Sequence, residues 1–251
     1  MTPNPVLSDR TTIVVGASRG LGRGIATAMA EAGAPVIALA RSAGALAEVV
    51  RTHPTIRSEV ADATDPTVAA ALLERHDPSV VVLVAGAAPP IHPLQDQTWE
   101  TFSVNWHTDV RIAFEWLRQA LLRPLKPGSR VVVISSGAAV QGSPLSGGYA
   151  GAKATQRFMS AYAQEEARRA GLDITFTAVL PRITPLTDLG RPAVQAYAAR
   201  AGQSEAEYLE RFGDLVSPEI AGGAVLELVQ ADALAVAPAY LLTGTGLQTL
   251  P

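Results

Sequence analysis

Seven short runs of aliphatic and β-branched residues recur along the chain, separated by stretches with the period of amphipathic helices. They span residues 11–15, 35–40, 56–60, 79–85, 130–135, 173–180 and 239–243. Runs such as SVVVLVA at 79–85 are apolar at consecutive positions, which is typical of strands buried on both faces of a parallel sheet. Strands that alternate with helices in this way predict an α/β fold. We therefore expect a Rossmann-like, doubly wound sandwich whose parallel sheet has about seven strands.

The helical stretches leave one long segment without a strand. Helices are expected near residues 20–32, 43–51, 66–76, 98–122 and 218–230, and a further helix carries Tyr149 and Lys153. No linker or internal repeat divides the chain, so residues 1–251 are predicted to form a single domain. The segment 184–216 is expected to hold a loop with one or two polar helices, and to act as a substrate-binding loop or lid within that domain.

Composition argues against several classes of function. The net charge of −3 offers no basic surface for nucleic acid or anionic membranes, and the absence of cysteine rules out disulfides and thiolate catalysis. The four histidines lack the spacing of metal ligands, so no metal site is expected. The N-terminal stretch has no basic segment followed by an apolar run, and the longest uncharged run is broken by Gly, Ser, Pro and Gln. We therefore predict a cytoplasmic protein that does not enter a membrane.

A glycine-rich turn follows the first predicted strand, and open parallel sheets bind ligands beyond the carboxyl ends of their strands. The sequence VVGASRGLGRG places Gly16, Gly20 and Gly22 where a helix begins. Glycines let backbone amides approach a pyrophosphate, and a helix N-terminus offers unpaired N–H groups and a favourable dipole. The alternative is a tight turn in which glycine serves close packing only. The residues expected to contact a dinucleotide here are Gly16, Ser18, Arg19, Gly20, Leu21 and Gly22.

The end of the second predicted strand indicates which dinucleotide binds. In such folds an acidic residue at this point holds the ribose 2′-hydroxyl, whereas an arginine accommodates a 2′-phosphate. The chain has Ala40 and Arg41 here and no carboxylate, and Arg19 could add a second guanidinium. This pattern predicts NADP(H) rather than NAD(H), the alternative being two solvated surface arginines.

Residues after the later strands complete the predicted cofactor site. Asp62 is expected to accept a hydrogen bond from the adenine amino group, although it could equally cap the next turn. Ala85 and Gly86 are small enough for the backbone to pass close to the cofactor ribose. The other predicted contacts are Ala63, Pro181 and Thr184, together with Tyr149 and Lys153.

Tyr149 and Lys153 are four residues apart, which places them on one face of a helix. The spacing alone fits an ordinary helix surface. It also fits proton transfer, because reduction of a carbonyl by hydride builds negative charge on an oxygen that then needs a proton. An ammonium beside a phenol stabilises the phenolate. Tyr149 would then be the acid in reduction and the base in oxidation.

The stretch VVVISSGAAVQGSPLSGGYAGAK resembles the active-site region of the short-chain dehydrogenase/reductase family. Ser136 and Tyr149 have the family's spacing, and with Asn105 in FSVNWHTDV and Lys153 they are similar to its catalytic tetrad. The resemblance implies that Asn105 holds a water connecting Lys153 to solvent, and that Lys153 also binds the nicotinamide ribose. Ser136 is expected to donate a hydrogen bond to the substrate oxygen, unless it only caps a turn. The family also implies a homodimer or homotetramer.

Three positions depart from the family pattern. Val15 stands where threonine is frequent, VLVAGA lacks the usual paired asparagines, and Arg182 follows Pro181 where glycine is usual. The segment after the sixth strand passes the nicotinamide in this family. Arg182 is therefore expected either to point to solvent or to reach a carboxylate or phosphate of the substrate or cofactor.

These observations predict an NADPH-dependent oxidoreductase that interconverts a small ketone or aldehyde and its alcohol, similar to carbonyl or 3-oxoacyl reductases. An NAD-dependent alcohol dehydrogenase is an alternative that would call for an acidic residue at position 40 or 41. A protein that senses NADPH without turnover is an alternative of another class. Such a sensor would be expected to lack Tyr149 or Lys153, and the chain has both.

Overall fold

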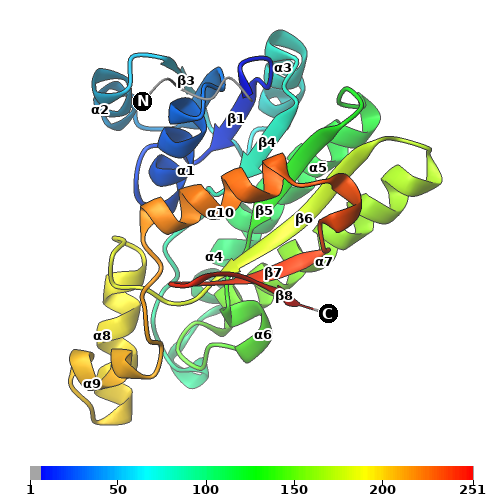
Figure 1. Ribbon diagram of the computed structural model, residues 1–251. Coiled ribbons are helices and arrows are strands. Elements are labelled where there is room, and N and C mark those ends of the chain that lie inside the picture. The colour runs from blue at the N-terminus through cyan, green and yellow to red at the C-terminus, as the bar shows by residue number, and fades with distance from the viewer. Residues whose placement is uncertain (1–6, 251) are drawn as a thin grey trace.

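An eight-stranded, mostly parallel sheet forms the centre of the computed structural model, which describes residues 7–250 (Figure 1). The strands are β1 (Thr12–Val15), β2 (Val36–Ala40), β3 (Ile56–Val60), β4 (Val80–Leu83), β5 (Ser129–Ile134), β6 (Ile174–Pro181), β7 (Ala239–Thr243) and β8 (Gly246–Leu250). Their order is β3-β2-β1-β4-β5-β6-β7-β8, in which β7 and β8 are antiparallel and the other neighbours parallel. The strand order reverses between β1 and β4, which is where doubly wound sheets open a crevice for ligands.

Helices cover both faces of this sheet (Figure 1). The α-helices are α1 (Gly20–Glu31), α2 (Ala43–Thr52), α3 (Pro66–His76), α4 (Trp99–Asn105), α5 (Arg111–Leu122), α6 (Ala138–Gln141), α7 (Gly147–Arg169), α8 (Gly190–Ala201), α9 (Glu205–Glu210) and α10 (Pro218–Gln230). The π-helical turn η3 (Trp106–Val110) joins α4 to α5, and 3₁₀ turns occupy η2 (Leu94–Asp96) and η4 (Ala233–Ala235).

The two layers explain why the strands are apolar at consecutive positions. Along β1, Val14 belongs to the core packed against α1, α2 and α10, whereas Ile13 and Val15 belong to the core packed against α3, α5 and α7. Because successive side chains of a strand point to opposite faces, a strand covered on both sides has no solvent-facing position. The predicted fold class is confirmed. Of the predicted single domain, residues 1–6 and 251 lie outside the described residues.

Two elements differ from the prediction. The eighth strand, GLQTL, has half-exposed and exposed residues at the edge of the sheet and therefore lacks a continuous apolar run. It pairs with β7 through a tight hairpin in which Gly246 has a φ of +113°. The helix predicted over 98–122 begins at Trp99 after a Thr98–Thr101 capping box, and the π-helical turn divides it into α4 and α5.

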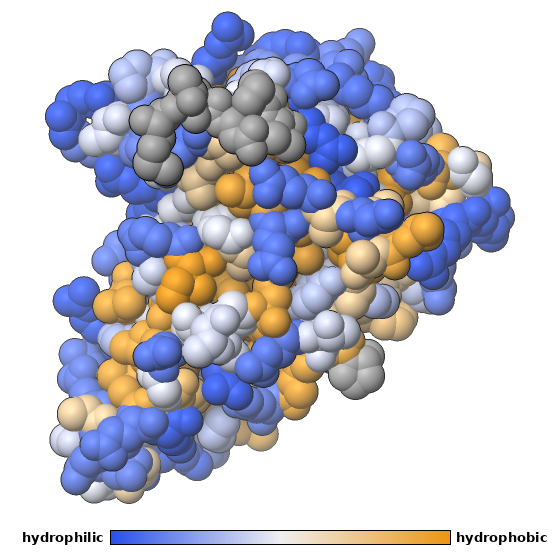
Figure 2. Space-filling view, in the orientation of Figure 1, coloured by the Kyte–Doolittle hydropathy of each residue, from blue (hydrophilic) through white to orange (hydrophobic). Residues whose placement is uncertain are grey.

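The segment 184–216 contains two helices, α8 and α9, which project together from one end of the sheet (lower left in Figure 1). A small apolar cluster of Val194, Ala198 and Tyr208 holds them together, and apolar residues gather on this part of the surface (Figure 2). The Tyr197 hydroxyl on α8 contacts Ser143 Oγ in the loop before α7. One or two helices are predicted here and the structure has two, while the role of the segment as a lid stays a prediction.

No helix within residues 7–250 is both long enough and apolar enough to cross a bilayer.

Candidate functional site

The glycine-rich turn lies where β1 and β4 part. Gly16 follows β1 with a φ of +95°, and a Cβ on it would lie 2.6 Å from the backbone nitrogen of Ala85, just beyond β4. A Cβ on Gly22 would lie 2.0 Å from the Gly16 carbonyl oxygen. Close packing therefore accounts for these two glycines. A Cβ on Gly20 would only touch the Thr187 side chain at 3.5 Å, but the φ of +52° favours glycine at this position.

The N-terminus of α1 suits an anion. Arg19 is its N-cap residue, and no side chain caps this end of the helix. The first turn carries no acidic residue either. A helix start without a side-chain cap leaves N–H groups for a ligand, and the helix dipole favours negative charge there. The turn therefore fits the pyrophosphate of a dinucleotide, with its close-packed glycines bringing the backbone near.

The residues predicted to bind the adenosine part of the dinucleotide are Arg19 before α1, Arg41 after β2 and Asp62 after β3. Arg41 is exposed, and Arg19 lies 3.7 Å from Asp188 in an equally exposed ion pair. Asp62 Oδ1 accepts hydrogen bonds from the backbone N–H and the hydroxyl of Thr64, at 2.9 and 2.8 Å. These bonds lower the pKa of Asp62, and the nearby charge of Arg41 lowers it further. Asp62 thus caps its own turn in this structure, and its contact with adenine stays a prediction.

The other predicted cofactor residues lie at the same edge of the sheet. Ala63 is buried, and Thr184 is buried with its hydroxyl accepting from the Leu186 N–H at 3.3 Å. A Cβ on Gly86 would lie 2.5 Å from the carboxylate of Asp109, so that carboxylate requires the glycine whether or not a cofactor binds. The carbonyl of Pro181, at the end of β6, accepts a hydrogen bond from the Gly137 N–H at 2.8 Å.

Tyr149 and Lys153 lie one turn apart on α7. The Lys153 Nζ atom is 5.6 Å from the centre of the Tyr149 ring, and Lys153 is buried whereas Tyr149 is half-buried. The first turn of α7 passes so close to α4 that a Cβ on Gly148 would lie 1.9 Å from the Phe102 carbonyl oxygen. This contact fixes the position of Tyr149, and the predicted pair is brought together.

Ser136 lies in the loop after β5, next to Ser135, which is hydrogen-bonded to α7. Its neighbour Ser135 is buried and donates through Oγ to the Lys153 carbonyl at 2.7 Å. Ser136 Oγ accepts from the N–H of Ala138, the first residue of the short helix α6, at 3.2 Å. Accepting this bond leaves the hydroxyl proton of Ser136 available for donation.

Two buried residues that the sequence analysis did not single out, Asp109 and Gln156, contact Lys153. Asp109 Oδ2 lies 3.1 Å from Lys153 Nζ in a charge contact that lacks hydrogen-bond geometry. Nζ donates to Gln156 Oε1 at 2.9 Å and, at 3.4 Å, to the carbonyl of Ile134. Burial acts to lower the pKa of Lys153, but the charges of Asp109 and Tyr149 outweigh it and raise that pKa above its ordinary value.

Asn105 reaches Lys153 through Asp109. Its amide nitrogen donates to the Ala87 carbonyl at 2.8 Å and to Asp109 Oδ1 at 3.2 Å, and the Ala87 N–H donates to the same Oδ1 atom at 2.9 Å. The sequence held a signal for both missed residues. Asp109 follows Asn105 by four positions and Gln156 follows Lys153 by three, which are the spacings of neighbours on one helix face.

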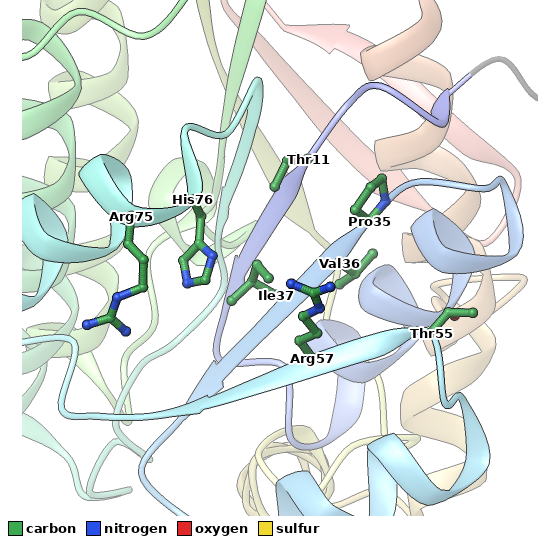
Figure 3. A pocket seen from close by; sticks show the side chains of 8 residues that line it. All are labelled: Thr11, Pro35, Val36, Ile37, Thr55, Arg57, Arg75 and His76. Carbon is green, nitrogen blue, oxygen red and sulfur yellow. The ribbon is translucent and has the colours of Figure 1, made fainter.

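A cavity of about 310 Å³ opens at the opposite edge of the sheet, at the amino ends of β1, β2 and β3 (Figure 3). It is lined in part by Arg57, Arg75 and His76. Arg75 and His76 are already paired with Glu59, at 3.0 and 2.9 Å. Ligands of such sheets bind at the carboxyl edge, so this cavity is not the candidate site. Among the residues that the structure describes, no group of three or more His, Cys, Asp or Glu could hold a metal ion.

Comparisons with known proteins identify the family of this chain. The family model for short chain dehydrogenases matches residues 10–198. The chain belongs to the short-chain dehydrogenase/reductase family. The short-chain dehydrogenase/reductase FrzI of Cladobotryum sp is 33% identical over 192 residues, which are 72% of this chain and 73% of that protein. As a member of this family the chain is an oxidoreductase with a fold that binds nicotinamide cofactors.

A reductase and a solved structure extend the comparison. The D-erythrulose reductase of Gallus gallus is 31% identical over 139 residues, covering 54% of this chain and 56% of that enzyme. The crystal structure of an actinorhodin polyketide ketoreductase with NADPH superimposes with a TM-score of 0.80 at 23% identity, covering 94% of this short-chain dehydrogenase/reductase and 97% of the ketoreductase. At that identity the superposition shows the shared fold.

Proposed function

We propose that this protein reduces a small ketone or aldehyde to the alcohol with NADPH, with Tyr149 as the proton donor. The observation that carries the proposal is the half-buried phenol of Tyr149 beside the buried ammonium of Lys153, at the edge of the sheet where the N-terminus of α1 has no side-chain cap. Relatives named as reductases support this direction of the reaction. The same residues act in reverse for oxidation of the alcohol.

The roles of the side chains follow from the charge that develops during reduction. Bound NADPH supplies the hydride. The hydroxyl of Ser136 donates a hydrogen bond to the substrate oxygen as it becomes negative, and Tyr149 delivers the proton. Lys153 stabilises the resulting phenolate by its charge and binds the nicotinamide ribose. Asn105 stays the residue through which Lys153 exchanges protons with solvent.

The cofactor is held by the residues predicted from the strand ends. The turn at 16–22 binds the pyrophosphate, Asp62 and Ala63 flank the adenine, and Ala85, Gly86, Pro181 and Thr184 line the path to the nicotinamide. NADPH is preferred because Arg41 is a cation where an NAD-dependent enzyme would place a carboxylate, and Arg19 in the glycine-rich turn adds a second cation.

A substrate panel tests the proposal. NADPH oxidation is measured at 340 nm with ketones, aldehydes, quinones and 3-oxoacyl thioesters, and we expect turnover of at least one class together with slower turnover with NADH. Tight NADPH binding without turnover on any member of the panel would instead support a cofactor sensor. Turnover with NADH that equals turnover with NADPH would support the NAD-dependent alternative.

Arg182 is proposed to contact an acidic group of the substrate or cofactor. It is half-buried beside Gly137, and its Nε atom is buried without a hydrogen-bond partner among the described residues. An ionic hydrogen bond to this guanidinium contributes about 1.5–3 kcal/mol. Arg182→Gly is therefore expected to raise KM about 10-fold or more for substrates with a carboxylate or phosphate. Initial-rate kinetics with acidic and neutral substrates, and with Arg182→Gln as the uncharged comparison, measure this effect. Unchanged KM values for every substrate and for NADPH would show that Arg182 does not make this contact.

An exposed aromatic surface supports a homodimer or homotetramer. Trp106 on η3, Phe114 on α5 and Phe158 on α7 are exposed, and these elements pack against one another. Large exposed apolar groups on adjoining helices mark protein interfaces. We expect sedimentation equilibrium to give the mass of two or four chains and Phe158→Glu to shift it towards one. A single-chain mass for the unmodified protein would contradict the assembly.

Location in the cytoplasm stays a prediction from the sequence.

A further inference from the structure

A buried ion pair lies behind the proposed proton donor. Asp109 Oδ2 and Lys153 Nζ are 3.1 Å apart, and the two side chains are only 1% and 6% exposed. Two charges removed from water in this way are costly unless further polar contacts surround each of them. Both charged groups have further polar contacts, unlike most ion pairs between exposed side chains.

The position of Asp109 is fixed independently of Lys153. Its Oδ1 atom accepts from the Ala87 N–H and from the amide of Asn105, at 2.9 and 3.2 Å. Its carboxylate packs against Gly86 so closely that a Cβ there would lie 2.5 Å from Oδ2. Asp109 belongs to the π-helical turn η3, and such turns inside α-helices occur frequently at functional sites. The loop after β4 and the turn η3 therefore hold the carboxylate in place before Lys153 is considered.

Gln156 closes the network on the other side of the ammonium. Its Oε1 atom accepts from Lys153 Nζ at 2.9 Å, and its amide nitrogen donates to the Asp109 carbonyl at 2.9 Å. The opposite orientation of the amide would set NH₂ against the ammonium and oxygen against a carbonyl, so these two partners fix it. Gln156 is 1% exposed and adds no charge.

Asp109 supplies the negative charge that the buried lysine needs. Among the described residues, Asp109 on η3 and Tyr149 on α7 are the titratable groups whose charges act on Lys153. The strand β5 contributes only the carbonyl of Ile134. A fully buried lysine without a counter-ion has a pKa about 3–5 units below its ordinary value and loses its proton near neutral pH. Here the nearby charges reverse that effect of burial and raise the pKa of Lys153.

We propose that Asp109 is a positioning residue that keeps Lys153 protonated in its buried site, and that it thereby sets the pH range in which Tyr149 can deliver a proton. The inference rests on the proposed function, in which the charge of Lys153 supports Tyr149. It assigns a role in the reaction to a residue outside the predicted tetrad. It also gives Asn105 a second task, because the Asn105 amide is one of the donors that orient the Asp109 carboxylate.

The pH profile of Asp109→Asn tests the proposal. Without the counter-ion, Lys153 is charged only at lower pH, so the alkaline limb of kcat/KM for reduction is expected to move towards acid by at least about one pH unit. At pH 8 we expect at least about a tenfold loss relative to the unmodified protein, which shrinks as the pH falls towards 6. The measurement is NADPH oxidation with a ketone that the unmodified protein reduces.

Gln156→Met is the matched control, because it removes a hydrogen bond to the same ammonium without changing any charge. It is expected to leave the alkaline limb in place, whatever it does to the rate. A loss in Asp109→Asn by the same factor at every pH would overturn the proposal, since that result describes a structural defect only. An equal shift of the limb in Gln156→Met would overturn it as well.

A stability measurement separates this inference from the proposed function, because it needs no substrate. In Asp109→Asn the pKa of Lys153 in the folded state falls below its value in the unfolded chain, so the unfolded chain binds more protons and stability rises with pH between the two values. The double variant Asp109→Asn/Lys153→Met lacks the unpaired charge. It is expected to unfold at a higher temperature than Asp109→Asn at pH 6, and to lack the rise with pH. If the double variant is no more stable than the single one, Asp109 is not the counter-ion, even where the substrate panel shows turnover.

Discussion

Tyr149→Phe is expected to lower kcat for ketone reduction by about 10²–10⁴-fold, which is the usual contribution of a positioned general acid. The variant keeps the ring that packs beside Lys153 and removes only the hydroxyl that is proposed to supply the proton. Binding of NADPH is expected to change little, because the pyrophosphate and the 2′-phosphate are predicted to bind to other residues. Steady-state rates with a substrate found in the panel, and NADPH titration by fluorescence, measure the two effects separately.

Tyr162→Phe provides the matched control for this change. Tyr162 lies on the same helix, α7, but it is exposed, and the same loss of a hydroxyl there should leave kcat unchanged. A Tyr149→Phe protein whose kcat stays within about tenfold of the unmodified value would show that the proton comes from elsewhere, because the whole range expected of a general acid lies above that factor.

The sheet could be predicted because it is buried on both faces. Burial on both faces forces apolar residues at consecutive positions, as in β4, where all four residues are buried. The edge strand β8 escapes this rule because solvent covers part of it, and Gln248 and Thr249 are exposed. The π-helical turn at Trp106–Val110 also gave no sequence signal, since hydrophobic periodicity does not distinguish one inserted residue within a helix of this length.

Some contacts of the candidate site could be predicted from the sequence and others could not. Tyr149 and Lys153 could be placed together because both lie on one helix, so a spacing of four fixes their relation. Contacts between elements are different. The approach of Asp109 to Lys153 depends on how η3 packs against α7, and a charged residue in a helix is more often on the surface than buried. Gly86 is a second example. The sequence suggests that it makes room for the cofactor, whereas the structure shows that the Asp109 carboxylate leaves no space for a side chain there.

The double variant Arg19→Ala/Arg41→Ala is expected to reduce the preference for NADPH over NADH, expressed as the ratio of kcat/KM values, by about 10²-fold or more. Each guanidinium that binds a phosphate contributes about 1.5–3 kcal/mol, and the 2′-phosphate is the part of NADPH that NADH lacks. Arg41 is exposed directly after β2 and its charge acts on Asp62, the residue predicted to contact the adenine. Arg19 is held by Asp188 at 3.7 Å, but an ion pair this exposed contributes at most about 1 kcal/mol and yields readily to a phosphate dianion.

The two arginines need a comparison in which an exposed arginine is removed elsewhere. Arg51→Ala removes an exposed arginine near the other end of α2, where it pairs with Glu48, and should leave the cofactor ratio unchanged. Because the double variant removes two charges from the phosphate site, its KM for NADPH should also become less sensitive to salt, whereas its KM for NADH should hardly change. If the ratio of the double variant stays within about twofold of the unmodified value, the arginines are solvated surface groups that do not select the cofactor.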